Sequence, residues 1–216
     1  MKIIVTGCKG QLGTEIIKQL REGRSEIGPI PEKLMNATVI PVDLPELDIS
    51  NYKMVDDFIR RQRPDVIINC AAYTNVDGCE VNHDAAFKAN ALGPAIWHRL
   101  PKRPAHGWCT FPPTMCSPAG RTAASRRMKP PCPGPSAPTA PPSSWAKSMW
   151  SGSATATSSC APRGCTATTD KNFVKTIVNA GKKFGKLEVV NDQCGNPTNA
   201  ADLAHEILQL CVTHEY

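Results

Sequence analysis

Three short apolar runs in the first half of the chain, at residues 2–6, 37–43 and 65–70, have the length and unbroken hydrophobicity of buried parallel strands. Stretches with apolar residues every three or four positions lie between and after them, and these predict helices over residues 14–20, 50–58, 82–92 and 200–210. Strands that alternate with helices indicate an α/β fold with a parallel sheet. We therefore expect residues 1–94 to form half of a Rossmann-like, doubly wound parallel sheet.

The first apolar run leads directly into three glycines spaced three apart, Gly7, Gly10 and Gly13. A tight turn, a close approach of the backbone to a pyrophosphate and the start of a helix each favour a residue without a Cβ. The free N–H groups at the start of the helix would face the anion. An ordinary turn can have the same spacing, but the strand before it and the helix after it favour nucleotide binding.

Two further features of the strand ends are typical of a dinucleotide site. Asp43 follows the second run, where a carboxylate can accept hydrogen bonds from both ribose hydroxyls of NAD. Its distance from the glycines exceeds the usual gap of about twenty residues, so spacing alone leaves a solvated loop acid equally open. The third run continues into the small residues Ala71 and Ala72, at the strand end where ligands of parallel sheets bind.

The composition bears on the cellular compartment of the protein and on whether its cysteines bind metal or form disulfides. No apolar run is long enough to span a membrane, and the first run leads into glycines rather than a cleavage site, so we expect a cytoplasmic protein without a membrane partner. The ten cysteines lack a repeated metal-ligand spacing. They are expected to be free thiols, and no metal site is expected.

The net charge of +6 suggests a nucleic-acid partner, but its distribution argues against one. Residues 95–169 carry nine of the 25 Lys and Arg and no Asp or Glu, so the rest of the chain has three more acidic than basic residues. The same stretch holds 13 of the 20 prolines and shows neither helical nor strand periodicity. It contains no basic helix interleaved with aromatic residues, so no nucleic-acid partner is expected.

Several segments together resemble the dTDP-4-dehydrorhamnose reductases, which are extended short-chain dehydrogenase/reductases. They are Thr-Gly-Cys-Lys-Gly-Gln-Leu-Gly at 6–13, Glu-Leu-Asp-Ile at 46–49, Arg-Pro-Asp at 63–65 and Cys-Ala-Ala-Tyr-Thr-Asn-Val-Asp at 70–77. Residues 171–176 and 191–198 resemble the beginning of the family's smaller substrate-binding lobe. The resemblance implies reduction of a nucleotide sugar, dTDP-4-dehydrorhamnose, to dTDP-rhamnose with NADH or NADPH.

The resemblance also implies roles for individual residues. It implies that the pyrophosphate is held by the glycine loop, through Gly7, Gly10, Gln11, Leu12 and Gly13. The adenine would contact Asp48 and Ile49, in the turn after the second strand. The nicotinamide side would be lined by Ala71, Ala72 and Tyr73 at the end of the third strand, and the sugar nucleotide would contact Val76.

Residues 95–169 depart from the family completely, although the family has there a strand ending in Ser or Thr and a Tyr-x-x-x-Lys helix. A disordered insertion is one interpretation. A sharper one is a frameshift, beginning near residue 94 and ending near Asp170. Grouped one base earlier, the codons of 112–117 permit Ser-Thr-Asp-Tyr-Val-Phe, those of 137–145 permit Tyr-x-x-x-Lys, and those of 160–167 permit Val-Arg-Thr-Ala-Trp-Leu-Tyr-Gly.

These observations divide the chain into three parts. Residues 1–94 are expected to be the N-terminal half of an NAD(P)-binding domain, 95–169 to be aberrant and without a packed core, and 170–216 to be a fragment of a substrate-binding lobe. In the family, the Tyr donates a proton to the ketone while the Lys lowers the pKa of the Tyr. No residue here replaces that pair, so we expect no catalytic residue and no activity as translated. A non-catalytic NAD(P)-binding regulatory subunit is the alternative, and the oligomeric state stays open.

Overall fold

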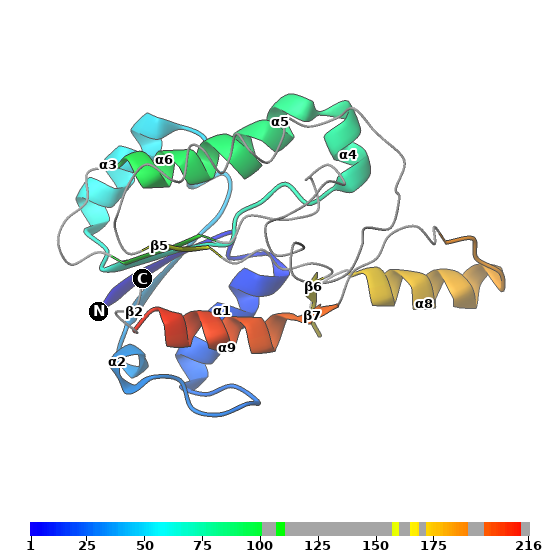
Figure 1. Ribbon diagram of the computed structural model, residues 1–216, viewed down its shortest axis with the longest axis horizontal. Coiled ribbons are helices and arrows are strands. Elements are labelled where there is room, and N and C mark those ends of the chain that lie inside the picture. Colours follow the sequence, from blue (N-terminus) through cyan, green and yellow to red (C-terminus); the bar gives the residue numbers. More distant parts are fainter. Residues whose placement is uncertain (101–106, 111–156, 160–164, 169–171, 190–196, 213–216) are drawn as a thin grey trace, which may run out of the picture.

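A parallel five-stranded sheet lies at the centre of the protein, with its strands in the order β2-β1-β3-β4-β5 (Figure 1). The structure, a computed structural model, describes residues 1–100, 107–110, 157–159, 165–168, 172–189 and 197–212. The strands are β1 (Lys2–Thr6), β2 (Thr38–Val42), β3 (Val66–Asn69), β4 (Gly107–Thr110) and β5 (Thr157–Ser159). The three apolar runs therefore form β1 to β3, and the predicted α/β fold with a parallel sheet is confirmed.

Helices follow the strands as the apolar periodicity predicts. They are α1 (Gln11–Glu22), α2 (Glu32–Met35), α3 (Tyr52–Gln62), α4 (Val76–Val81), α5 (His83–Phe87), the π-helix η1 (Lys88–Leu92), α6 (Gly93–Arg99), α8 (Phe173–Phe184) and α9 (Ala200–Leu210). Beside them, β6 (Cys165–Thr166) and β7 (Thr198–Asn199) pair in a small second sheet. The helix expected over residues 82–92 is divided into α5 and η1 and continues through α6, because Pro94 occupies a position in a first helical turn that requires no N–H donor.

The alternation of side chains along β1 separates two apolar layers. Ile3 and Val5 pack with α1 and α9 on one face, whereas Ile4 packs with α3 and α6 on the other. All three side chains are fully buried. Figure 1 shows α1 and α9 on one side of the sheet and α3 and α6 on the opposite side. The sheet is therefore covered on both faces, as a doubly wound fold requires.

The C-terminal helix α9 returns to the sheet instead of entering a separate lobe. Its apolar side, including Leu203 and Ile207, belongs to the same buried cluster as β1 and α1. The Gln19 side-chain amide on α1 also donates to the carbonyl of Ala201, at 2.8 Å. The assignment of residues 170–216 to a substrate lobe stays a prediction, but the position of α9 (Ala200–Leu210) on the sheet differs from it. The reason is that α9 covers apolar surface of β1 and α1 that would otherwise face water.

The packed core also extends beyond the boundary expected at residue 94. Ile96, Trp97 and Leu100 have the spacing of one helix face, are at most 4% exposed and pack against the second face of the sheet. Further along the chain, β4 pairs with β3 in parallel register, and β5 pairs with β4. Parts of 95–169 therefore join the sheet and its cover, while 101–106, 111–156 and 160–164 lie outside the described residues.

Candidate functional site

The carboxyl ends of β1 and β3 form the crevice of the sheet. The chain passes from β1 to β2 on one side and then crosses to β3 on the other, so the strand order reverses between β1 and β3. Ligands of open parallel sheets bind at such a reversal. The Thr6 hydroxyl donates to Oδ1 of Asn69 at 2.6 Å, and both side chains are buried. This hydrogen bond holds the two strand ends together directly beneath the glycine loop.

The three glycines of the loop have different reasons for lacking a side chain. Gly7 has a φ of +63°, and a Cβ there would lie 2.6 Å from the backbone nitrogen of Ala71. A Cβ on Gly13 would lie 2.3 Å from the carbonyl oxygen of Gly7. Gly10 is extended, with a φ of −78°, and its Cβ would meet only that same oxygen, at 3.4 Å. The fold itself therefore requires Gly7 and Gly13, whereas Gly10 leaves space on the outer side of the loop.

The start of α1 is arranged to face an anion. Gly10 is its N-cap, no side chain caps it, and its first turn has no acidic residue. Leu12 in that turn is partly buried against the core, so its backbone and not its side chain faces the loop. Burial, and then the negative charge of Asp43, raises the pKa of the Cys8 thiol. The thiol is therefore neutral near pH 7 and adds no negative charge to the loop.

Asp43 is joined to the glycine loop by hydrogen bonds. The backbone N–H of Lys9 donates to its Oδ2, and the backbone N–H of Leu44 donates to its Oδ1, each at 2.9 Å. The long gap from the glycines is occupied by α2 and the loop before it, so β2 still lies next to β1. The carboxylate is thus held beside the glycine loop, and its contact with the ribose hydroxyls stays a prediction.

The side chains of Asp48 and Ile49 are used by the fold. Oδ1 of Asp48 accepts hydrogen bonds from the backbone N–H of Ser50, at 2.9 Å, and from its hydroxyl, at 2.7 Å. Ile49 is 6% exposed and packs under α6, where a Cβ on Gly93 would lie 2.6 Å from its Cδ1. Any contact of Ile49 with an adenine would therefore come from its backbone.

Ala71, Ala72 and Tyr73 follow β3 at the opposite wall of the crevice, and all three are half-buried. The side-chain amide of Asn90 holds this wall, because its Oδ1 accepts from the N–H of Tyr73 at 2.8 Å and its Nδ2 donates to the carbonyl of Tyr73 at 3.0 Å. The sequence interpretation did not include Asn90. An asparagine within a helical stretch indicates such a role only once η1 is seen to turn it toward residue 73.

Val76 is the first residue of α4, directly beyond this wall. Oδ1 of Asn75 caps the helix by accepting a hydrogen bond from the N–H of Gly78, at 3.0 Å. The side chain of Val76 lies outside the described part of the chain, so its expected contact with the sugar nucleotide stays a prediction.

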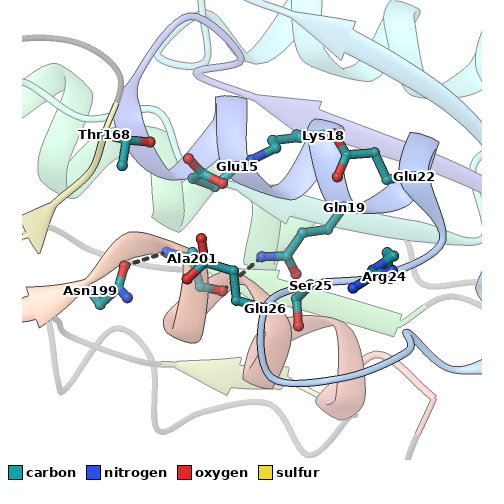
Figure 2. Close-up of a pocket in the computed structure, with 10 residues that line it drawn as sticks. All are labelled: Glu15, Lys18, Gln19, Glu22, Arg24, Ser25, Glu26, Thr168, Asn199 and Ala201. Atoms are coloured by element: carbon teal, nitrogen blue, oxygen red, sulfur yellow. Dashed lines mark hydrogen bonds between the residues drawn. The ribbon is translucent and has the colours of Figure 1, made fainter.

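A cavity of about 250 Å³ lies elsewhere, at the seam between α1 and α9 (Figure 2). It is lined by Glu15, Lys18, Gln19, Glu22, Arg24, Ser25, Glu26, Thr168, Asn199 and Ala201. None of these is a residue that the sequence assigns to the cofactor. The hydroxyl of Ser25, one of these lining residues, and Nδ1 of His205 on α9 form a hydrogen bond of 2.8 Å. The cavity therefore belongs to the junction of the two helices and not to the crevice.

Across the described residues, no three His, Cys, Asp or Glu side chains are grouped so that they could hold a metal ion. The same residues contain no helix that is both long and apolar enough to cross a membrane. In the part of the chain that the structure describes, Cys8, Cys70, Cys79, Cys165 and Cys211 are not in disulfides, which agrees with the expectation for these five.

Comparison with known proteins adds independent information. Residues 1–102 and 164–215 match the family described as RmlD substrate binding domain. A dTDP-4-dehydrorhamnose reductase of Mycobacterium tuberculosis strain H37Rv is 30% identical over 217 residues, which cover 97% of this chain and 65% of that protein. The chain thus spans about two thirds of the length of this relative.

Solved structures agree with the sequence comparison. The chain is similar to a dTDP-4-dehydrorhamnose reductase of Clostridium acetobutylicum, with 31% identity, a TM-score of 0.74 and coverage of 97% of this chain and 70% of that one. It is also similar to a dTDP-4-dehydrorhamnose reductase of Bacillus anthracis in complex with NADP, with 25% identity, a TM-score of 0.75 and coverage of 100% and 72%.

Proposed function

Because the chain belongs to the RmlD substrate binding domain family, we propose that it derives from an NADH- or NADPH-dependent reductase of dTDP-4-dehydrorhamnose and is inactive as translated. One observation carries the proposal. The crevice between β1 and β3 keeps the loop, the acid and the strand end that a dinucleotide needs, while the chain has no Tyr-x-x-x-Lys pair. The product would be dTDP-rhamnose, and the reaction would take place in the cytoplasm.

The residues of the crevice fit the binding of the dinucleotide cofactor. The backbone of the glycine loop and the start of α1 would hold the pyrophosphate, and Asp43 would accept the ribose hydroxyls. Ala71 and Ala72 would leave space for the nicotinamide beside the strand end that Asn90 fixes. When bound, NADH or NADPH would supply the hydride.

The chain lacks the general acid that would protonate the ketone oxygen. Tyr73 is part of the crevice wall, but a Cβ on Gly78 would lie 2.6 Å from its hydroxyl, so that hydroxyl packs against α4. Four residues later the chain has Asp77, not a lysine, so nothing there would lower the pKa of a phenol. Without a positioned proton donor the reaction loses general-acid assistance of about 10²–10⁴ in rate.

The position of β4 supports the frameshift. β4 lies between β3 and β5, and inner strands of parallel sheets are normally continuous apolar runs, whereas β4 reads Gly-Trp-Cys-Thr. Grouped one base earlier, the codons of 108–111 permit Leu-Val-Tyr-Ile, directly before the Ser-Thr-Asp-Tyr-Val-Phe permitted at 112–117. The same grouping permits a tyrosine at the codon of Thr139 and a lysine at that of Ser143. The family match, moreover, does not include residues 103–163.

The helix α8 supports keeping residues 172–189 as a fragment of a substrate lobe. It contains no buried residue, and Phe173 and Phe184 are 62% and 66% exposed. In Figure 1 it projects away from the sheet. Apolar side chains in this number on one helix indicate a face that further protein normally covers.

A non-catalytic NAD(P)-binding regulatory subunit is the second candidate. It is favoured by the same combination of an intact cofactor crevice and a missing proton donor. The two candidates differ in what a restored reading frame does, because only the first predicts recovered activity.

The test compares two versions of the protein. One is the 216-residue chain, and the other is read in the shifted frame over 95–169 and extended to the full length of its relatives. We expect oxidation of NADH or NADPH with dTDP-4-dehydrorhamnose only by the second version. Turnover by the first version would overturn the conclusion that the proton donor is missing. Absence of NADH and NADPH oxidation by a folded second version would favour the regulatory subunit. Resequencing the gene across this stretch tests the frameshift itself.

A further inference from the structure

The cavity between α1 and α9 (Figure 2) contains buried hydrogen-bond acceptors that the fold does not use. Of the residues that line it, Glu15, Gln19 and Ser25 are buried, and we call these three the floor. We propose that the cavity binds a small organic cation with N–H donors, an alkylammonium or a guanidinium, through the carboxylate of Glu15 and Oε1 of Gln19. The cavity lies apart from the crevice between β1 and β3, so this inference does not rest on the proposed function.

The spacing of residues along α1 brings the two acceptors together. Glu15 and Gln19 are four positions apart, so their side chains lie one above the other on the same face of the helix. They are only 3% and 2% exposed, although such side chains are rarely buried without a partner. This face is turned toward α9, because the side-chain amide of Gln19 donates to the carbonyl of Ala201 at 2.8 Å.

Oε1 of Gln19 is a buried acceptor without a hydrogen-bond partner. The bond from Nε2 to Ala201 fixes the orientation of the amide, since the reversed amide would place two oxygens against each other. Figure 2 shows this bond, with the amide oxygen on the side away from Ala201. A buried amide oxygen that lacks a donor is costly, so the site favours a ligand that brings one.

The carboxylate of Glu15 has the same requirement. In the part of the chain that the structure describes, it takes part in no hydrogen bond or ion pair. An ionised carboxylate out of water requires donors or a positive charge. Ser25 does not supply them, because its hydroxyl already donates to the carbonyl of Gly28 and is hydrogen-bonded to Nδ1 of His205. The unpartnered polar atoms of the floor are therefore acceptors, which complement a cation with N–H groups.

The charges at the rim of the cavity do not change this preference. The rim has two basic and two acidic side chains, all exposed, and their fields are screened by water and salt. They are Lys18, Arg24, Glu22 and Glu26. With Glu15 in the floor, the lining has three carboxylates and two cations, a net charge of −1 that suits a monovalent cation.

The size and the ligand geometry of the cavity favour an organic cation. Its volume of about 250 Å³ is below the range of about 300–1,000 Å³ that is typical of pockets for larger ligands, so it suits a short-chain amine or guanidine. A metal ion is not favoured, because the described residues include no group of three His, Cys, Asp or Glu side chains that could hold one.

The experiment is a titration of the 216-residue chain with three probes at constant ionic strength, followed by amide NMR. Butylammonium has the charge and the N–H donors, tetramethylammonium has the charge without an N–H donor, and butanol has the carbon chain without the charge. The reporters are the side-chain amide of Gln19 and the backbone amide of Ala201. We expect butylammonium to shift both signals saturably, and the other two probes to bind about tenfold more weakly or not at all.

Two variants locate the carboxylate that binds the cation. Glu15→Gln keeps the shape of the side chain but removes its charge, and should weaken butylammonium about tenfold or more. Glu22→Gln removes the same charge from the exposed rim, and as the matched control it should change the dissociation constant less than about twofold. A thermal melt of each variant verifies folding. Without ligand, Glu15→Gln should not lower the Tm, because it removes a buried charge that has no partner.

The results that would overturn the inference are distinct from one another. Absence of a saturable shift with butylammonium at millimolar concentrations would overturn the site. Equal affinity for tetramethylammonium would overturn the role of the N–H donors, and equal weakening by Glu15→Gln and Glu22→Gln would mean that general negative charge attracts the cation. These outcomes hold whether or not the chain binds NADH. If Glu15→Gln does not fold, the comparison of the three probes on the parent chain decides the question.

Discussion

Substitution of Gly10 distinguishes what the fold requires from what the ligand requires, because the backbone of the loop tolerates a side chain at this glycine. Its extended conformation suits any residue, and a Cβ there would meet only the Gly7 oxygen, at an ordinary 3.4 Å. In Gly10→Val, the lower entropy of the unfolded chain stabilises by about 0.4–1 kcal/mol. The loss of a favourable N-cap residue opposes this by a similar amount. The stability should therefore change by less than about 1 kcal/mol, or about 2–4 °C in Tm.

Cofactor binding should respond very differently. A branched side chain at Gly10 would stand between the loop and a pyrophosphate, and would remove two or more charge-assisted N–H contacts of about 1.5–3 kcal/mol each. The combined loss of about 3–6 kcal/mol corresponds to NADH binding roughly 10²–10⁴ times weaker. Thermal unfolding and NADH titration on the same preparations measure both quantities.

Gly13→Ala is the matched control. Its Cβ would lie 2.3 Å from a backbone oxygen, so the loop must shift, at a cost of about 1–3 kcal/mol or more. It should lower the Tm, whereas Gly10→Val should not. Unchanged NADH affinity in a folded Gly10→Val protein would refute the reasoning, and so would a Tm loss equal to that of Gly13→Ala.

Three further predictions concern contacts that the sequence did not reveal. Asn90→Ala should cost about 1–3 kcal/mol, because it removes two hydrogen bonds to the backbone of Tyr73, and hydrogen exchange at the Tyr73 amide should rise sharply. Unchanged protection of this amide would contradict the role of Asn90. His205→Ala should destabilise by about 1–3 kcal/mol in urea unfolding, since it breaks the bond to Ser25 and opens the seam, and additive loss with Ser25→Ala would argue against their coupling. The pKa of the Cys8 thiol is raised in the folded state, so this thiol ionises at lower pH in the unfolded chain than in the folded protein. The stability that the neutral Cys8 thiol contributes is therefore complete below its unfolded pKa and is lost as the pH rises through its folded pKa. Urea unfolding at increasing alkaline pH should show a smaller decline for Cys8→Ala than for the parent, and identical declines would contradict it.

Patterns close together along the chain determined the local elements and their type. The apolar runs of β1 and β3 and the spacing of Ile16, Ile17 and Leu20 require burial wherever these elements pack, so their identity follows from hydrophobicity alone. The spacing of the glycines likewise indicated a loop at the carboxyl end of the first strand.

Only the tertiary structure decided which distant segments meet. Gln19 and Ala201 are 182 positions apart, and no local pattern distinguishes a helix that completes the sheet's cover from one in a separate lobe, because both have one apolar face. The bond from the Lys9 backbone to Asp43 spans 34 positions and depends on β2 lying next to β1. The difference between Gly10 and Gly13 depends on how closely the backbone of Gly7 and Cys8 approaches each of them, which follows from the folded loop and not from residue type.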